Sequence, residues 1–232
     1  MTRLLVVNAD DFGLGGGVNA GIARGHRDGI VTSTSLMVTG RAPEHAAELA
    51  REHPELGVGL HWDLDAEVGG APVPLEDAGA VRHELTRQLD AFDRLMGRPA
   101  THVDSHHHVH RRDEVAPIAR EVAAALRVPL REAGSVRYVG SFYGQWEWQV
   151  TDLEHVGPEY LIWILRNEVN EGWTEIGCHP GFVTDDLTSG YLAEREVEVE
   201  TLTDPRVAAE ICALGIRLAS YADLPPPADP DG

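Results

Sequence analysis

The sequence contains no lysine, and all 19 of its basic residues are arginine. Schiff-base enzymes and P-loop nucleotide-binding proteins both depend on a lysine, so the sequence excludes both classes. Acidic residues number 38, which gives a formal net charge of −19 at pH 7. Such a chain repels nucleic acid and anionic membrane surfaces, so we expect neither as a partner and favour a neutral or cationic substrate.

Cysteine and long apolar runs are also scarce. The two cysteines, Cys178 and Cys212, do not suggest a disulfide framework, and we expect them to be reduced thiols. The apolar run from Leu4 to Val7 is too short for a signal peptide, and no stretch reaches the ~18 consecutive apolar residues of a membrane helix. The sequence therefore predicts a cytoplasmic protein without a membrane segment.

The chain does contain short apolar runs that alternate with segments of helical period, a pattern typical of βα units in a parallel sheet or barrel. Its 232 residues, 43% hydrophobic and 25% charged, suit one globular domain, expected over residues 1–224. The tail at 225–232, rich in Pro and Asp, is expected to be disordered. The predicted strands lie at 4–7, 35–38, 56–60, 102–103, 136–139, 176–178 and 217–221. The predicted helices lie at 18–27, 43–52, 81–95, 115–126, 160–170 and 205–214.

Four of the predicted strands lead directly into Asp or His. Asp10 and Asp11 follow the first strand, His61 the third, His106 the fourth and His179 the sixth. Reactive groups of barrels and open parallel sheets gather at the carboxyl ends of strands, so these side chains are expected at one mouth. A carboxylate with two imidazoles forms a suitable ligand set for zinc or another divalent transition metal, with positions left for water and substrate.

The adjacent acids Asp10 and Asp11 are the sharpest local feature. On an extended chain their side chains point to opposite sides, so that one can bind the metal while the other faces the reacting water. Paired acids also occur as turn or helix-cap residues, but the company of the other strand ends favours a functional interpretation.

Residues 102–110 contain five histidines in nine positions. If this run is extended, Asp104, His106, His108 and His110 share one face and His107 points the other way. A histidine-rich tract can also be a weak surface metal buffer. The apolar residue and the aspartate within the run favour a built site, in which Asp104 or Ser105 orients a ligating imidazole through its second nitrogen.

Three further features admit two interpretations each. His179 precedes a proline in an extended geometry, which suits either an acid/base role or a structural turn. Arg131 either anchors Asp10 or a substrate oxygen, or is an ordinary surface arginine. The aromatic residues after the fifth strand form either a stacking platform for a sugar ring or a core or interface patch. They are Phe142, Tyr143, Trp146 and Trp148.

Five ordered motifs stand out along the chain: NADDFGL at 8–14, GIVTSTSLM at 29–37, GVGLH at 57–61, THVDSHHHVH at 101–110 and CHPG at 178–181. Together they resemble the motifs of the YdjC-like carbohydrate deacetylases, which include chitooligosaccharide deacetylases, and the resemblance runs from the first strand to about Leu224. It implies a distorted (β/α) barrel, similar to a TIM barrel, in a single α/β domain. The segment 64–84 is shorter than in many relatives, where loops of this region shape the substrate cleft.

The resemblance also implies roles for individual residues. Asp11, His61 and His106 would hold one divalent metal, Asp10 would be the general base and His179 the acid. Asp104, His108, His110 and Arg131 are candidates for orienting the ligands or contacting substrate. The carboxylate and imidazole set suits zinc, while magnesium, cobalt and nickel remain open.

The predicted activity is removal of an N-acetyl group from an amino sugar or acetylated oligosaccharide by metal-activated water. Alternatives are a metal-dependent hydrolase of a phosphoester or glycolipid amide, since Asp and His also build two-metal sites, and a noncatalytic metal- or sugar-binding protein. The exposed aromatic stretch permits a homodimer but does not require one.

Overall fold

The computed structural model describes residues 2–147, 150–185 and 187–225 of the 232. In this part of the chain, parallel strands form one sheet in the order β4-β3-β2-β1-β6-β5, and β7 pairs with β1. The strands are β1 (Arg3–Phe12), β2 (Ser33–Leu36), β3 (Gly57–Trp62), β4 (Val103–Ser105), β5 (Val136–Val139), β6 (Gly172–Cys178) and β7 (Ile216–Leu218). The α-helices are α1 (Gly16–Asp28), α2 (Pro43–Glu52), α3 (Ala78–Met96), α4 (Ala116–Leu126), α5 (Pro158–Asn167), α6 (Ala193–Leu202) and α7 (Pro205–Ala213), and the 3-10 helices are η1 (His106–Arg111), η2 (Leu153–Val156) and η3 (Tyr221–Asp223).

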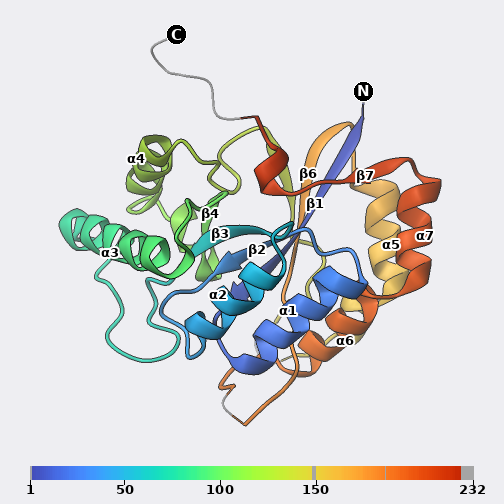
Figure 1. The fold of residues 1–232 in the computed structure, drawn as a ribbon, viewed down its shortest axis with the longest axis horizontal. Coiled ribbons are helices and arrows are strands. Elements are labelled where there is room, and N and C mark those ends of the chain that lie inside the picture. Colours follow the sequence, from blue (N-terminus) through green and yellow to red (C-terminus); the bar gives the residue numbers. More distant parts are fainter. Residues whose placement is uncertain (1, 148–149, 186, 226–232) are drawn as a thin grey trace.

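Strand β1 lies in the middle of the sheet, and its residues from Leu5 to Phe12 are all buried. A strand covered on both faces needs a continuous apolar run rather than an alternating one, and the Leu-Leu-Val-Val segment at 4–7 supplies it. The helices contact one another in the order α4, α3, α2, α1, α6, α5, α7, which follows the order of the strands. Figure 1 shows this layer of helices around the sheet.

The sheet is strongly curved, as a contact across it shows. Asp104 of β4 and Glu175 of β6 both lie within 3 Å of Arg131, at 2.9 and 2.7 Å, although β3, β2 and β1 separate the two strands. In a flat sheet these strands would be ~19 Å apart, too far for one guanidinium group to reach both. The strands therefore curl into a half-barrel, and the predicted α/β fold with a (β/α) barrel architecture is confirmed.

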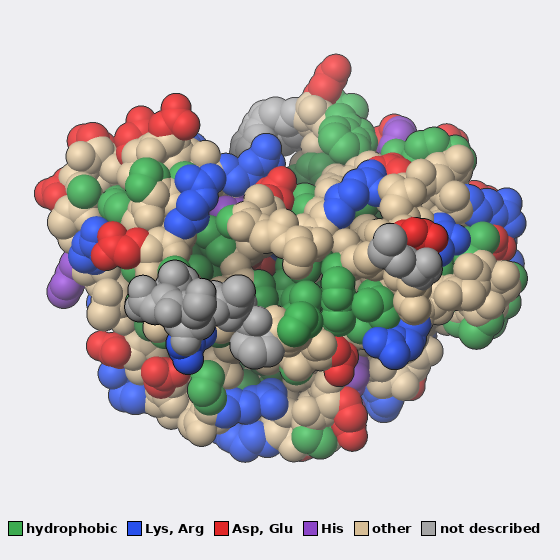
Figure 2. All heavy atoms as spheres, turned by 90° about the horizontal axis from the view of Figure 1, so that it is seen from above, with side chains coloured by type: hydrophobic (Ala, Val, Ile, Leu, Met, Phe, Trp, Pro, Cys, Tyr) green, Lys and Arg blue, Asp and Glu red, His purple; other side chains and the backbone are tan. Residues whose placement is uncertain are grey.

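The start of β1 and the long loops lie at opposite ends of this half-barrel. Figure 1 shows the amino-terminal end of β1 at the top, whereas the loops that follow β3 and β6 extend on the lower side. On the face seen from above in Figure 2, acidic and basic side chains are interspersed around a hydrophobic area. No helix in the described part of the chain combines the length and apolarity that crossing a membrane requires.

All seven predicted strands and all six predicted helices are present, with ends that differ by a few residues. Among the described α-helices, α6 is the one that the periodicity does not predict, because it buries Glu194, Arg195, Glu198 and Thr201 among its apolar residues. Residues 226–232 of the predicted disordered tail lie outside the described residues, as does Trp148.

The extended geometry considered for residues 102–110 is wrong. Strand β4 ends at Ser105, and His106 begins the 3-10 helix η1, within which His107 and His108 have left-handed backbone angles, with φ of 49° and 51°. The histidines therefore do not alternate between two faces, and their side chains are distributed over a tight turn.

Candidate active site

Asp10 lies near the carboxyl end of β1, and four hydrogen bonds fix its carboxylate. Arg131 donates through Nη1 to Oδ2 and through Nη2 to Oδ1, each at 2.7 Å, and Asn8 and Ser35 donate to Oδ1 at 2.8 and 3.3 Å. Burial on its own would raise the pKa of Asp10, but the Arg131 guanidinium outweighs it, and the pKa lies below its ordinary value. Asp10 is therefore an ionised, oriented carboxylate at neutral pH.

Arg131 is one of the largest fully buried side chains, so the interpretation as a surface arginine does not hold. Besides Asp10, its guanidinium contacts Asp104 and Glu175, and Glu175 in turn accepts a hydrogen bond of 2.5 Å from the Tyr221 hydroxyl. Burial raises the pKa of Glu175 to about 7 despite the arginine. One buried cation thus contacts three carboxyl groups from different strands.

Asp11, His61 and His106 converge from β1, β3 and η1. Asp11 Oδ1 lies 3.5 Å from His61 Nε2 and 3.1 Å from His106 Nδ1, and one ligand atom from each of the three residues lies within 4.8 Å of the others. Asp104 Oδ1 lies 2.8 Å from His61 Nδ1 and fixes the orientation of that ring. These three ligand atoms are close enough together to bind one divalent ion.

The expectation that Asp10 and Asp11 point to opposite sides is wrong. The register of β1 against β2 shifts between Ala9 and Phe12, and Asp11 has a left-handed φ of 69°. Each of the two carboxylates forms a separate cluster with His61 within 4.8 Å. The local irregularity of the strand therefore turns both acids toward the same interior.

The residues present fit a cation. Asp11 Oδ2 accepts from Arg195 at 2.7 Å, while Oδ1 faces His61 Nε2 at 3.5 Å and His106 Nδ1 at 3.1 Å. Mixed imidazole and carboxylate donors suit zinc and its neighbours in the first transition row. Arg131 already contacts both carboxylates of the other cluster, Asp10 and Asp104 around His61, whereas Oδ1 of Asp11 faces imidazoles, so the Asp11 cluster is the better candidate for a metal.

His179 follows β6 and approaches Asp10 from the other side. Its Nε2 lies 3.9 Å from Asp10 Oδ2, and its backbone N–H donates to Glu198. Its buried Nδ1 has no hydrogen-bond partner in the described part of the chain. Burial lowers the pKa of His179 to about 4, so the ring is neutral at neutral pH and can accept a proton.

Aromatic side chains flank His179. Tyr143 lies 5.7 Å from the His179 ring, stacks on Tyr191 at 4.9 Å and meets Trp146 edge to face. Trp146 is 56% exposed, whereas Phe142 is buried in the core. The aromatic stretch thus divides into a core residue and an accessible pair beside the candidate site.

Arg195 and Glu198 are site residues that the sequence reasoning missed. Both project from α6: Arg195 holds Asp11, and Glu198 accepts from the His179 backbone and from the Tyr191 hydroxyl at 2.5 Å. Burial raises the pKa of Glu198 to about 8. The sequence does contain a signal for these two residues: Glu194, Arg195 and Glu198 are spaced so that a helix places them on one side.

His108 and His110 lie on η1, near Glu132. Burial lowers the pKa of His108 to about 3 and of His110 to about 4, so both rings are neutral at neutral pH. Ser105 Oγ lies 2.7 Å from His110 Nδ1, and the Tyr138 hydroxyl lies 3.4 Å from His108 Nε2. Neither histidine belongs to the Asp11 cluster.

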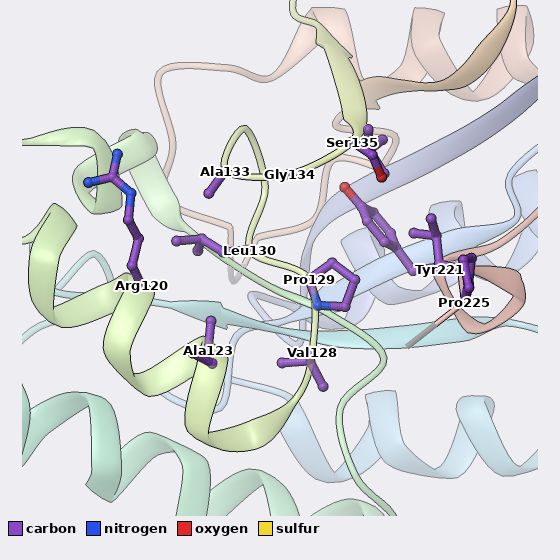
Figure 3. Close-up of a pocket in the computed structure, with 13 residues that line it drawn as sticks. Arg120, Ala123, Val128, Pro129, Leu130, Ala133, Gly134, Ser135, Tyr221 and Pro225 are labelled. Carbon is purple, nitrogen blue, oxygen red and sulfur yellow. The ribbon is translucent and has the colours of Figure 1, made fainter. Parts of the chain in front are cut away.

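A separate cavity of about 380 Å³ lies between the C-terminal end of α4 and the start of β5. Its lining is largely apolar and includes Val128, Pro129, Leu130 and Tyr221, as Figure 3 shows. None of the clustered aspartates and histidines lines it, so this cavity is distinct from the candidate active site. Tyr221 links the two, because its hydroxyl contacts Glu175.

These features define a class of protein: a single-domain (β/α) barrel with a buried carboxylate and histidine site at the carboxyl ends of its strands. Within that class the chain belongs to the YdjC-like protein family, whose model matches residues 4–213.

The curated relatives match almost the whole chain. A carbohydrate deacetylase from Geobacillus stearothermophilus is 35% identical and covers 97% of this chain and 99% of its own length. A chitooligosaccharide deacetylase from Yersinia enterocolitica is 36% identical and covers 96% and 100%. The first alignment spans 253 positions against 232 residues here, so that relative carries residues that this chain lacks.

Solved structures agree with the fold. A protein from Enterococcus faecalis V583, described as a proposed cellobiose-phosphate cleavage protein, superposes with a TM-score of 0.83 at 29% identity, covering 95% of this chain and 98% of its own. A family 4 carbohydrate esterase from Streptomyces lividans has a TM-score of 0.56 at 12% identity, covering 94% and 91%. The second likeness concerns the fold alone.

Proposed function

We propose that this chain is a metal-dependent hydrolase that removes the acetyl group from the amino nitrogen of a sugar or short oligosaccharide. The observation that carries the proposal is the position of Asp10, an ionised carboxylate fixed by Arg131 beside the Asp11–His61–His106 cluster and 3.9 Å from His179. The deacetylase names of the full-length relatives support the same reaction class.

Asp11, His61 and His106 would hold one divalent ion, with zinc the best match to the donor set and magnesium, cobalt and nickel the alternatives. Such an ion would lower the pKa of a water molecule from near 16 to about 7 and polarise the acetyl carbonyl. Asp104 orients His61, and Arg195 orients Asp11, so that the ligand atoms keep their arrangement.

Asp10 accepts the proton of the attacking water in this proposal. Arg131 and Asn8 hold the carboxylate in place, and its ionised state leaves it free to take a proton. Asp10 is not part of the Asp11–His61–His106 cluster, so it can face the attacking water while those three residues hold the metal.

His179 delivers a proton to the leaving amine as the C–N bond breaks. Because its ring is neutral, it must first gain that proton, and Asp10 Oδ2 lies 3.9 Å from its Nε2. A small movement or one bridging water would let the proton collected from water pass from Asp10 through His179 to the amine nitrogen. The hydrogen bond from the His179 backbone to Glu198 fixes the ring's starting point.

The half-buried Tyr143 and the exposed Trp146 would bind the sugar ring beside His179, because aromatic faces pack well on the apolar faces of sugars. An excess of buried carboxylates around the site disfavours anionic substrates, which supports a neutral acetamido sugar over a phosphoester.

The direct test is acetate release. Metal-loaded protein is incubated with N-acetylglucosamine and its short oligomers, with a chelated sample and the Asp10→Asn variant as controls. Acetate that appears only in the loaded wild-type sample supports the proposal, and the dependence on chain length identifies the preferred substrate. A chain that binds one metal tightly yet releases no acetate from any of these sugars refutes it, and phosphate release from an aryl phosphate would favour the phosphoesterase alternative.

A further inference from the structure

A second cluster of metal-ligating side chains lies outside the proposed catalytic site. His108 Nδ1 and His110 Nε2 both face Glu132 Oε2, at 3.7 and 4.0 Å, and one ligand atom from each of the three residues lies within 4.8 Å of the others. No residue of this cluster belongs to the Asp11–His61–His106 group. The two imidazoles come from η1, and the carboxylate comes from the segment that follows Arg131.

Both imidazoles are arranged as metal ligands usually are. The far nitrogen of each ring meets a hydroxyl group: His110 Nδ1 lies 2.7 Å from Ser105 Oγ, and His108 Nε2 lies 3.4 Å from the Tyr138 hydroxyl. The near nitrogens, His110 Nε2 and His108 Nδ1, are buried and have no hydrogen-bond partner among the residues that the structure describes. A ligating histidine typically uses its second nitrogen in this way, which fixes the ring and directs the other lone pair at the ion.

Burial makes the unpartnered nitrogens informative. His110 is 3% exposed, so water does not reach it readily from outside, and an unpaired polar atom at such a position is unfavourable. The distances to Glu132 are too long for hydrogen bonds but close to the separation of two ligands around one ion, ~3.3–3.5 Å for metal–ligand distances near 2.0–2.1 Å. A cation between the three groups would satisfy all of them.

The backbone supports the same arrangement. His108 and Glu132 both have left-handed backbone angles, with φ of 51° and 61°, which residues with a side chain rarely adopt. The competing partner of Glu132 is Arg111, whose Nε lies 3.5 Å from Oε2 but whose side chain is 59% exposed and free to turn to solvent. An exposed ion pair of this kind contributes little, so it does not account for the strain.

We propose that His108, His110 and Glu132 form a second cation site, which takes zinc or a similar divalent transition ion. Two imidazole nitrogens and one carboxylate oxygen favour zinc over magnesium, which prefers an all-oxygen shell. The ion links η1 to the segment that carries Arg131, the residue that holds Asp10. Its occupancy therefore stiffens the support of Asp10 without adding a ligand to the catalytic cluster.

The test counts zinc ions bound per chain and does not depend on deacetylase activity. Equilibrium dialysis of the wild-type chain against zinc is expected to give two ions per chain, and Glu132→Gln one. His61→Ala is also expected to bind one, retained at the second site. Because the count is independent of turnover, a chain that binds two ions but releases no acetate would refute the proposed function and leave this inference standing.

The matched control is His107→Ala. His107 lies next to His108 on η1 but belongs to a different cluster, with Glu67 and His106, and this variant is expected to keep two ions. One ion in the wild-type chain, two in Glu132→Gln, or loss of the second ion in His107→Ala would each overturn the proposal. If Glu132→Gln fails to fold, anomalous scattering at the zinc edge from wild-type crystals decides: a peak between the three side chains supports the site, and its absence at saturating zinc overturns it.

Discussion

Asp10 and Asp11 are neighbours in the sequence but have different surroundings. Asp10 meets Arg131, Asn8 and Ser35, whereas one oxygen of Asp11 faces two imidazoles. Because the two aspartates contact different groups, we expect them to have different roles, and mutation of each one can separate these roles.

Asp10→Asn should retain the metal and lose about 10²–10⁴-fold in kcat, because an amide of the same shape cannot accept the proton of the water. Asp11→Asn should lose metal as well as activity, since it removes a charged ligand from the cluster. Metal content by atomic emission and initial rates of acetate release, measured on the same samples, give the comparison. Normal turnover in Asp10→Asn would eliminate this residue as the base.

The buried Glu198 should make the stability of the folded chain depend on pH. Its folded-state pKa of about 8 lies above the ordinary 4.5, chiefly because of burial, so the folded chain holds a proton that the unfolded chain has released between these values. The stabilisation from the protonated group is complete below about pH 4.5 and is lost as the pH rises through 8.

Glu198→Gln has no such titration. The free energy of unfolding of the wild-type chain should therefore fall relative to that of Glu198→Gln, by on the order of 1–3 kcal/mol, as the pH rises from about 5 to 8. Urea unfolding at a series of pH values measures this difference. Glu200→Gln, an exposed position on the same helix, should run parallel to the wild-type chain. If the Glu198→Gln curve is parallel as well, Glu198 does not titrate in this range.

At the scale of elements, α1 and the loop after β6 approach each other unusually closely. A Cβ atom on Gly21 would lie 2.5 Å from Gly181 Cα and 2.8 Å from its nitrogen, whereas a Cβ on Gly16 would meet nothing within 4 Å. Only glycine at position 21 lets the helix pack against the segment that carries His179.

Gly21→Ala is therefore expected to destabilise the chain by ~1–3 kcal/mol and to displace His179, with a loss of kcat larger than the change in KM. Gly16→Ala, on the same helix, controls for helix propensity. It should change the free energy of unfolding by no more than ~1 kcal/mol and leave kcat and KM close to the wild-type values. Thermal melts and steady-state kinetics test the pair. Equal behaviour of the two variants would mean that the loop adjusts without cost.

Some elements of the fold can be predicted from the sequence, and others cannot. Strands such as β1 and β3 are predictable because an apolar run followed by Asp or His carries its own signal. Helix α6 carries no such signal, because its buried face includes Arg195 and Glu198, which are buried only because Asp11 and His179 lie there to pair with them. A partner brought from more than 180 positions away, as Asp11 is for Arg195, cannot be inferred from local periodicity.

At the scale of the whole molecule, the barrel brings together what the sequence separates. The convergence of strand ends predicted which residues would meet, but not that Arg131 would cross the interior to contact β1, β4 and β6. That contact depends on the curvature of the sheet, a property of all seven strands. The same reasoning explains why the turn at η1 was not predicted: its shape is imposed by the groups around it rather than by its own sequence.

Metal binding should stabilise the molecule as a whole. Asp11, His61 and His106 belong to three separate segments, so an ion bound by all three stabilises the folded chain, which alone brings them together. With free metal at 100 times the Kd, the gain is about 2.7 kcal/mol, or about 5–10 °C in Tm for a chain of this size. Thermal melts with saturating zinc and with excess chelator measure the shift, and His61→Ala with Glu132→Gln should abolish it. Glu132→Gln alone removes only the second ion, so it should keep most of the Tm shift if the catalytic cluster binds zinc more tightly. An unchanged Tm in the wild-type chain would mean that the Asp11 cluster holds no metal.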